Sequence, residues 1–371
     1  MSSRSEFPRI PLEAAACRTP LGDARTTCAA LLAGRGALRL EPVLGQAGGE
    51  PVPLALLPGR ALAETAPPSG LACLDALAAE VPPAPWGDGR HPVFVTGSNF
   101  GVGSLEAHHR DGDPRHLEVC TPFALVELLR RRFGWGDNVA VLSHACVSAH
   151  LGLRLGGRLL AAGLADRALV FSFDFLSPFV TGGFHALKIL NGLMPAPYAD
   201  APAGAIGLGD GAAFAVLGRP GSGFGLSAET LHNEMHHFTA NQPDGAGFER
   251  CLEPVAAAAR GRKVWLKGHG TGTLEAGRLE AAAFARRFPG SPLVSWKGGI
   301  GHTLGSCGLV ELALALEAFR AGRAPGTVGG RSPCFGDQVA LEAFPLGEFD
   351  GAVLASNAFG GAHAAFLLTH D

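Results

Sequence analysis

The sequence predicts an α/β fold made of two similar units. Short apolar runs with β-branched residues are typical of buried strands, and here they are followed by glycine-containing turns and helices of small or apolar residues. This succession occurs in both halves of the chain, around residues 138–163 and again around residues 292–321. Alternating strands and helices favour sheets covered by helices. We divide the chain into an N-terminal unit, residues 1–220, and a C-terminal unit, residues 221–371.

The first unit is expected to begin with a strand and a helix that ends at Gly34. Residues 43–70 are rich in Pro and Gly and are interpreted as a surface loop. The run 138–142 fits a fully buried strand. The expected strands lie within residues 9–17, 92–96, 138–142, 168–173 and 212–217, and the expected helices within 24–33, 71–79, 122–133 and 148–163.

The second unit repeats these features. Two predicted strands, residues 263–267 and 292–296, each run into a Gly-rich turn. A long apolar helix is expected at residues 307–321, and terminal strands at 352–356 and 364–368. This repetition is the main argument for two related halves.

Composition excludes several classes of protein. The chain has 371 residues, 47% hydrophobic and 17% charged, which is too apolar for a disordered chain. A net charge of -3 without long basic runs argues against nucleic-acid binding. The eight cysteines are scattered without a CxxC pair, so we expect no zinc cluster or disulfide framework and a reduced, cytoplasmic setting. We expect no signal peptide and, without an apolar stretch of about 18 residues, no membrane span.

Three segments place a reactive side chain where a predicted strand ends, the position at which open α/β sheets usually bind ligands. The first is Ser143–Ala149, with Cys146 at the start of a helix. Free N–H groups and the helix dipole lower a thiol pKa there and can stabilise an oxyanion. A buried structural cysteine is the alternative for this motif taken alone.

The second segment, Gly268–Thr273, reads Gly-His-Gly-Thr-Gly-Thr and precedes Glu280. Its glycines allow a substrate to approach the backbone closely. The third, Lys297–Gly308, supplies a lysine and a second histidine, His302. One cysteine and two histidines fit a thiol nucleophile beside two imidazoles that polarise a carbonyl. Either histidine alone could instead satisfy buried backbone groups.

Together these segments resemble the beta-ketoacyl synthase family of the thiolase-like superfamily. Ser143–Ala149 is similar to its nucleophile motif, 269–280 to its HGTGT motif with a downstream acid, and 297–308 to its lysine and GHT segment. Residues 356–363 resemble a shortened NSFGFGGTN loop. The motifs follow the family's order over nearly the whole chain. The resemblance implies a thiolase-like fold: two related halves, each with a mixed five-stranded sheet, layered αβαβα.

The resemblance also implies roles for individual residues. Cys146 would carry the acyl chain as a thioester, while His269 and His302 would stabilise the enolate formed by decarboxylation of a malonyl-type extender. Lys297 would orient the histidine region, and Glu280 would support it. The residues implied to contact substrate are Thr271 and Thr273, on a phosphopantetheine arm, and Phe359, as a gate whose N–H joins that of Cys146 in an oxyanion hole.

The implied reaction is decarboxylative Claisen condensation in fatty acid or polyketide biosynthesis, with an aryl-polyene-like system as one setting. The implied partner is an acyl carrier protein, whose phosphopantetheine arm carries the substrate, with no cofactor bound by the chain itself. A homodimer or a heterodimer with a second ketosynthase-like subunit is implied, through the sheet edge near Cys146. Two alternatives stay open: a non-decarboxylating acyltransferase of the same fold, and a non-catalytic partner subunit like a chain-length factor.

Several residues depart from the family pattern. Gly277 stands where the family usually has Asp, His363 replaces Asn, and the Phe359 loop is shortened. The run His232–His237 contains residue types found at metal sites but not the HExxH spacing, so we expect no metal. His108 and His109 are interpreted as part of a solvated loop, and Cys307 as core packing.

Overall fold

The computed structural model describes residues 8–45, 48–62, 68–237 and 239–370. The expectation of no signal peptide depends on residues 1–17, of which the first seven lie outside these ranges, as does part of the loop expected at 43–70. Within the described chain, none of the helices combines the length and apolar character needed to cross a bilayer.

Two sets of five strands form the framework. The first set has the order β6-β5-β7-β9-β1, and the second has the order β12-β11-β15-β16-β10. Their bounds are β1 Ile10–Thr19, β5 Val93–Thr96, β6 Val139–Leu142, β7 Ala168–Asp174, β9 Gly211–Leu217, β10 Phe224–Asn233, β11 Val264–Lys267, β12 Leu293–Val294, β15 Gly351–Ala358 and β16 Ala362–His370.

Each set is mixed in the same way, which confirms the prediction of two related five-stranded halves. In the first, β5 is parallel to β6 and β7, and β9 is antiparallel to both its neighbours. In the second, β11 is parallel to β12 and β15, and β16 is antiparallel to both its neighbours. The sets join where β1 pairs with β10. The division of the chain at residues 220 and 221 stays a prediction.

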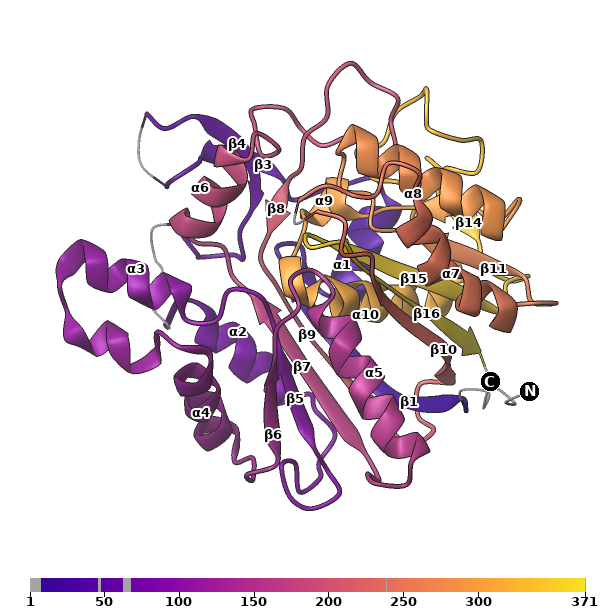
Figure 1. Ribbon diagram of the computed structural model, residues 1–371. Helices are drawn as coiled ribbons and strands as arrows, with labels where there is room; N and C mark the ends of the chain where they lie inside the picture. Colours follow the sequence, from indigo (N-terminus) through magenta and orange to yellow (C-terminus); the bar gives the residue numbers. More distant parts are fainter. Residues whose placement is uncertain (1–7, 46–47, 63–67, 238, 371) are drawn as a thin grey trace.

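Helices lie between and outside the two sets of strands (Figure 1). Helices α5 (Ser148–Ala161) and α10 (Cys307–Arg320) form the middle layer and share one core with strands of both halves. Helices α2 (Pro68–Ala78) and α4 (Pro122–Phe133) cover the outer face of the first half, and α7 (Ala246–Ala258) and α8 (Leu274–Arg287) that of the second. The apolar sequence of α10 follows from its position in the middle layer, where almost every side chain is buried.

Shorter elements complete the fold. Helix α1 begins after Asp23, whose carboxylate caps it by accepting a hydrogen bond from Thr26 N at 2.8 Å. The remaining elements are α1 Ala24–Leu32, α3 Val102–Asp111, α6 Pro178–Ala186, α9 Lys297–Ile300, the 3-10 turns η1 Pro114–Val119 and η2 Leu304–Ser306, and the short strands β2 Gly22–Asp23, β3 Arg39–Pro42, β4 Pro51–Ala55, β8 Leu208–Gly209, β13 Arg323–Ala324 and β14 Phe344–Pro345.

The structure corrects three expectations. The predicted loop 43–70 contains β4, which pairs with β3 and β8 and lies in a buried apolar cluster. His108 and His109 lie on α3 rather than in a loop. Strand β6 is half-buried rather than fully buried, because it is the last strand of its set and no other strand of the described residues pairs with its outer edge. Apolar composition alone cannot separate an edge strand from a central one.

Candidate active site

Cys146 lies in the turn that connects β6 to α5, as the sequence predicts. Ala145 adopts a positive φ of 47°, a conformation that is strained for a residue with a Cβ. Ser148 supports the turn: its Oγ accepts a hydrogen bond from His144 N at 2.7 Å and donates one to Ala145 O at 2.6 Å. The backbone strain and its support fix Cys146 at the head of the helix, where its side chain is 9% exposed.

The structure brings both predicted histidines to Cys146. Nε2 of His302 lies 2.9 Å from the Cys146 Sγ. The ring of His269 stands perpendicular to that of His302, with the ring centroids 4.8 Å apart. A hydrogen bond fixes the backbone of His302, whose N–H donates to Gly207 O at 2.7 Å. Thus one thiol and two imidazoles, from three separate motifs, meet in one place.

Burial determines the charge state of these groups. It lowers the pKa values of His269 and His302 far below the ordinary value, and the positive charge of Lys297 lowers them further. Both rings are therefore neutral. Burial also raises the pKa of Cys146, with Lys297 acting in the opposite direction. The thiol consequently needs a nearby proton acceptor before it can attack a thioester, and His302 is at hydrogen-bonding distance.

Glu280 holds the loop that carries His269. Its carboxylate accepts hydrogen bonds from His269 N at 2.6 Å and Gly270 N at 2.9 Å. It also accepts from the Tyr198 hydroxyl at 2.8 Å and from Asn357 Nδ2 at 3.0 Å. The position of Glu280 therefore fits the supporting role that the sequence suggests.

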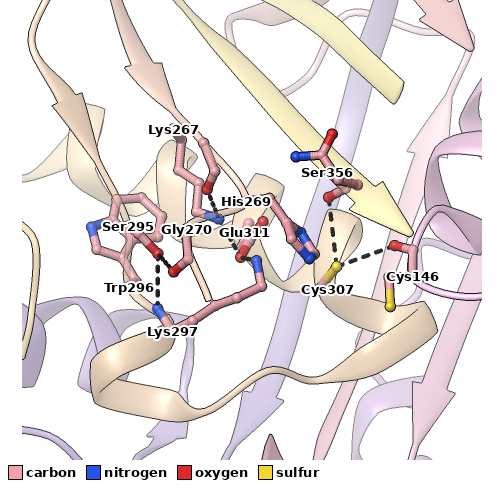
Figure 2. Close-up of polar contacts among 12 residues, drawn as sticks. Cys146, Lys267, His269, Gly270, Ser295, Trp296, Lys297, Cys307, Glu311 and Ser356 are labelled. Atoms are coloured by element: carbon pink, nitrogen blue, oxygen red, sulfur yellow. Dashed lines mark hydrogen bonds and ion pairs between the residues drawn. The ribbon is translucent and has the colours of Figure 1, made fainter. Parts of the chain in front are cut away.

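Lys297 does not bond a histidine side chain; its ammonium pairs with Glu311, at 2.5 Å. Lys267 pairs with the same carboxylate from the opposite side, and all three side chains are buried (Figure 2). Burial lowers the pKa of Lys297, but Glu311 and the other groups around its ammonium together raise it above the ordinary value, whereas burial lowers the pKa of Lys267 to about 8. Two lysines on one carboxylate leave positive charge near His269, which helps to keep its ring neutral.

Sequence reasoning missed Glu311 and Lys267. A usable signal was present, since Glu311 is an acidic residue in the otherwise apolar run 307–316 and a buried charge requires a partner. Cys307, interpreted as core packing, is buried but also contacts the backbone of Cys146. Its Sγ lies 3.3 Å from Cys146 O and 3.5 Å from the Ser356 Oγ (Figure 2).

A cavity of about 220 Å³ opens onto Cys146 and both histidines. Its walls combine apolar side chains, including Ile189 and Ile206, with hydroxyl groups. Thr271 and Thr273 both line it, with their hydroxyl oxygens 3.3 Å apart. Phe359 is 38% exposed and stacks on Phe184, with the ring centroids 5.8 Å apart. The cavity can therefore accept a ligand that has both a polar arm and an apolar chain.

Comparison with known proteins finds similarity to beta-ketoacyl synthases. The family model described as "Beta-ketoacyl synthase, C-terminal domain" matches residues 226–331, less than a third of the chain. The 3-oxoacyl-[acyl-carrier-protein] synthase 2 of Coxiella burnetii is 27% identical over 263 residues, 63% of this chain and 62% of that protein.

Other ketosynthases show similar levels of identity. A putative polyketide beta-ketoacyl synthase 1 of Streptomyces halstedii is 25% identical over 288 residues, 71% of this chain and 68% of that protein. The chloroplastic synthase II of Arabidopsis thaliana is 28% identical over 276 residues, 67% of this chain. The matched region spans only about half, 51%, of that relative.

Solved ketosynthase structures share the fold. A ketosynthase of Xenorhabdus doucetiae, in complex with its chain length factor, matches with a TM-score of 0.80 and 21% identity over 100% of both chains. The ketosynthase complex AntDE:AntF, with a type II acyl-carrier protein, matches with a TM-score of 0.83 and 15% identity over 98% of this chain and 100% of that chain. These likenesses confirm the predicted thiolase-like α/β fold.

Proposed function

We propose that this chain is a beta-ketoacyl-[acyl carrier protein] synthase that catalyses decarboxylative Claisen condensation. The observation that carries this proposal is the 2.9 Å contact between the Cys146 thiol and His302 Nε2, beside His269, at one wall of a mixed apolar and polar cavity. Because both imidazoles are neutral, each can accept a proton or donate a hydrogen bond without a metal ion.

The first half-reaction loads Cys146. His302 accepts the thiol proton as Sγ attacks the carbonyl of an acyl thioester on the carrier protein. The new C–S bond forms, the carrier's pantetheine sulfur leaves, and the proton passes to that sulfur. Backbone N–H groups of Cys146 and Phe359 are the donors we assign to the oxyanion.

The second half-reaction forms the carbon–carbon bond. The bond to the carboxylate of a malonyl thioester breaks, carbon dioxide leaves, and the electron pair enters an enolate. N–H groups of His269 and His302 donate to the enolate oxygen. The enolate carbon attacks the acyl-Cys146 carbonyl and forms the C–C bond, the C–S bond breaks, and the departing Sγ takes up one proton from solvent. Lys297 and Glu280 act as positioning residues, while Thr271 and Thr273 hold the phosphopantetheine arm.

The proposed partners are an acyl carrier protein and a second ketosynthase-like subunit. Structural relatives were solved with a chain length factor or with a carrier protein, which supports a homodimer or heterodimer here. The sheet edge at strand β6, which leads to Cys146, is the interface we propose. Its apolar residues are half-exposed, and its outer edge is unpaired in the described residues. We place the chain in fatty acid or polyketide biosynthesis, with an aryl-polyene-like system as the specialised setting.

Intact-protein mass spectrometry tests the loading step. Incubation with a panel of acyl-carrier proteins should add one acyl group, which should be absent in Cys146→Ala. Release of carbon dioxide from malonyl-carrier protein tests the condensation. If acyl transfer proceeds without carbon dioxide release, the chain is a non-decarboxylating acyltransferase. Undiminished product from a complex containing Cys146→Ala would instead indicate a non-catalytic subunit.

A further inference from the structure

The run His232–His237, which has no place in the proposed mechanism, contains one buried acid, Glu234, which contacts the hairpin that carries Phe359. Glu234 follows the end of β10, and its side chain is 0% exposed. Its Oε2 lies 3.2 Å from Nε2 of His363 on β16, and the His363 side chain is also 0% exposed. Strands β10, β15 and β16 lie side by side here (Figure 1). Burial of both partners makes this pair different from an exposed ion pair.

Glu234 is fixed against the hairpin that carries Phe359. Its backbone N–H donates to Gly361 O at 2.9 Å, and its Oε1 accepts from Gln242 N at 2.8 Å. A Cβ added at Gly361 would lie 2.5 Å from Glu234 Cγ. The Glu234 residue is therefore packed closely against the hairpin backbone at Gly361.

The pair also connects to the loop that carries His269. The Nδ1 of His363 lies 2.9 Å from Oδ1 of Asn357, and Nδ2 of Asn357 donates to Glu280 at 3.0 Å. Glu280 in turn accepts from the backbone N–H of His269. One buried chain of contacts thus runs from Glu234 to the proposed catalytic histidine.

The hydrogen bonds in this series of contacts need one more hydrogen atom than a neutral histidine and an ionised carboxylate supply. Glu280 accepts, so the amide nitrogen of Asn357 faces it and the amide oxygen faces His363. Nδ1 of His363 must then donate. A neutral imidazole has only one N–H, so Nε2 would present a lone pair to the Glu234 carboxylate. A proton between Nε2 and Oε2 removes this repulsion.

We propose that Glu234 and His363 share one proton and act as positioning residues for the hairpin that carries Phe359. The hairpin is tight, because Ala358 pairs with Ala362 across only three intervening residues. When the proton is present, the hydrogen bond between Glu234 and His363 links the end of β10 to β16 next to the turn. Phe359 then keeps its position at the cavity. The kinetic consequence rests on the proposed acyl loading of Cys146, whereas the shared proton does not.

The surroundings set the direction of the pH dependence. Asn357 contacts His363 from β15, Phe248 packs on its ring from α7, and His232 is the other titratable group beside it, from β10. Burial lowers the pKa of His363, and Glu234 opposes that effect. The proton is held at low pH and lost as pH rises, so the hairpin is less firmly positioned on the alkaline side.

Glu234→Gln tests the inference, because its amide N–H can donate to Nε2 of His363 in place of the titrating proton. In the wild type we expect kcat/KM for acyl loading to fall about tenfold as the proton is lost, equivalent to one charge-assisted hydrogen bond. In Glu234→Gln this pH dependence should be absent. The exposed pair His116 and Asp111, 3.0 Å apart, supplies the control, since Asp111→Asn should keep the wild-type profile.

Nitrogen-15 NMR of labelled histidines, together with carbon-13 NMR of labelled glutamate carboxyl groups, tests the proton directly, with the signals of the pair assigned from His363→Asn and Glu234→Gln. Protonated Nδ1 together with either protonated Nε2 or a protonated Glu234 carboxyl at low pH supports the proposal. Equal pH profiles for wild type and Glu234→Gln, or a pair that carries only the Nδ1 hydrogen throughout, would overturn it. A shared proton in a chain that releases no carbon dioxide would instead leave this inference standing and reject the proposed reaction.

Discussion

At the scale of single residues, the charge cluster behind the site has the largest consequence for stability. Glu311 is the shared partner of Lys267 and Lys297, and the three side chains are buried. Removing one member of a buried ion pair costs about 3–5 kcal/mol, because the remaining charge is left without a partner. Glu311→Gln should therefore lower the free energy of unfolding by about that amount.

Chemical denaturation measures this change, and Glu348→Gln is the matched control. Glu348 pairs with Lys263 at the surface, where its side chain is 81% exposed, and such pairs contribute about 0–1 kcal/mol. Similar stability losses in the two variants would show that the buried cluster adds nothing beyond a surface pair.

His150 gives a pH prediction at the same scale. Burial lowers its pKa from 6.5 to about 4, and its ring packs on Phe366 with a centroid distance of 5.2 Å. The unfolded chain takes up this proton below its ordinary pKa, while the folded chain does not until about pH 4. Stability is thus lost as pH falls through this window.

Between pH 7 and pH 5 the loss from His150 should be about 2 kcal/mol, and His150→Leu should remove that part of the slope. Urea unfolding at both pH values measures it. A variant with the full wild-type pH dependence would assign the effect to the other buried histidines.

The site was predictable from sequence only where chemistry and spacing occur within one segment. Cys146, His269 and His302 each lie in a motif at a strand end, so the sequence identifies them. The partner of Glu234 lies on β16, far away in the chain, and no local pattern indicates that contact. Contacts of this kind depend on strand order, which follows from the fold.

At the scale of elements, periodicity predicted five of the helices, α1, α2, α4, α5 and α10, and the central strands. Helix α4 has the predicted bounds, and α10 differs by one residue. Helices α3, α6 and α8 were not predicted, and neither were strand β10 and helix α7. β10 is only partly buried beyond residue 226, so its apolar pattern is interrupted, and α7 contains Pro254. Tertiary packing, rather than local preference, determines these two elements.

At the scale of the whole molecule, strand β6 ends the sheet, and its outer edge has no pairing strand in the described part of a single chain. Backbone N–H groups at the start of β5 and just after its end donate to the carbonyls of residues 138 and 142. Because the hydrogen-bonding groups of successive residues in a strand point to opposite sides, the N–H of Val141 points away from β5. A second subunit that pairs along this edge would use the outward N–H of Val141. Proline at this position removes that donor while keeping the ladder within the chain.

Val141→Pro should therefore remain folded and lose subunit pairing. Analytical ultracentrifugation measures the mass, and circular dichroism measures the fold. Ala140→Pro is the control, because its N–H faces β5 and its loss should cost about 3 kcal/mol or more of stability. If folded Val141→Pro has the same oligomeric mass as the wild type, subunits do not join through β6. In that case the half-exposed apolar residues of this edge must be covered in some other way.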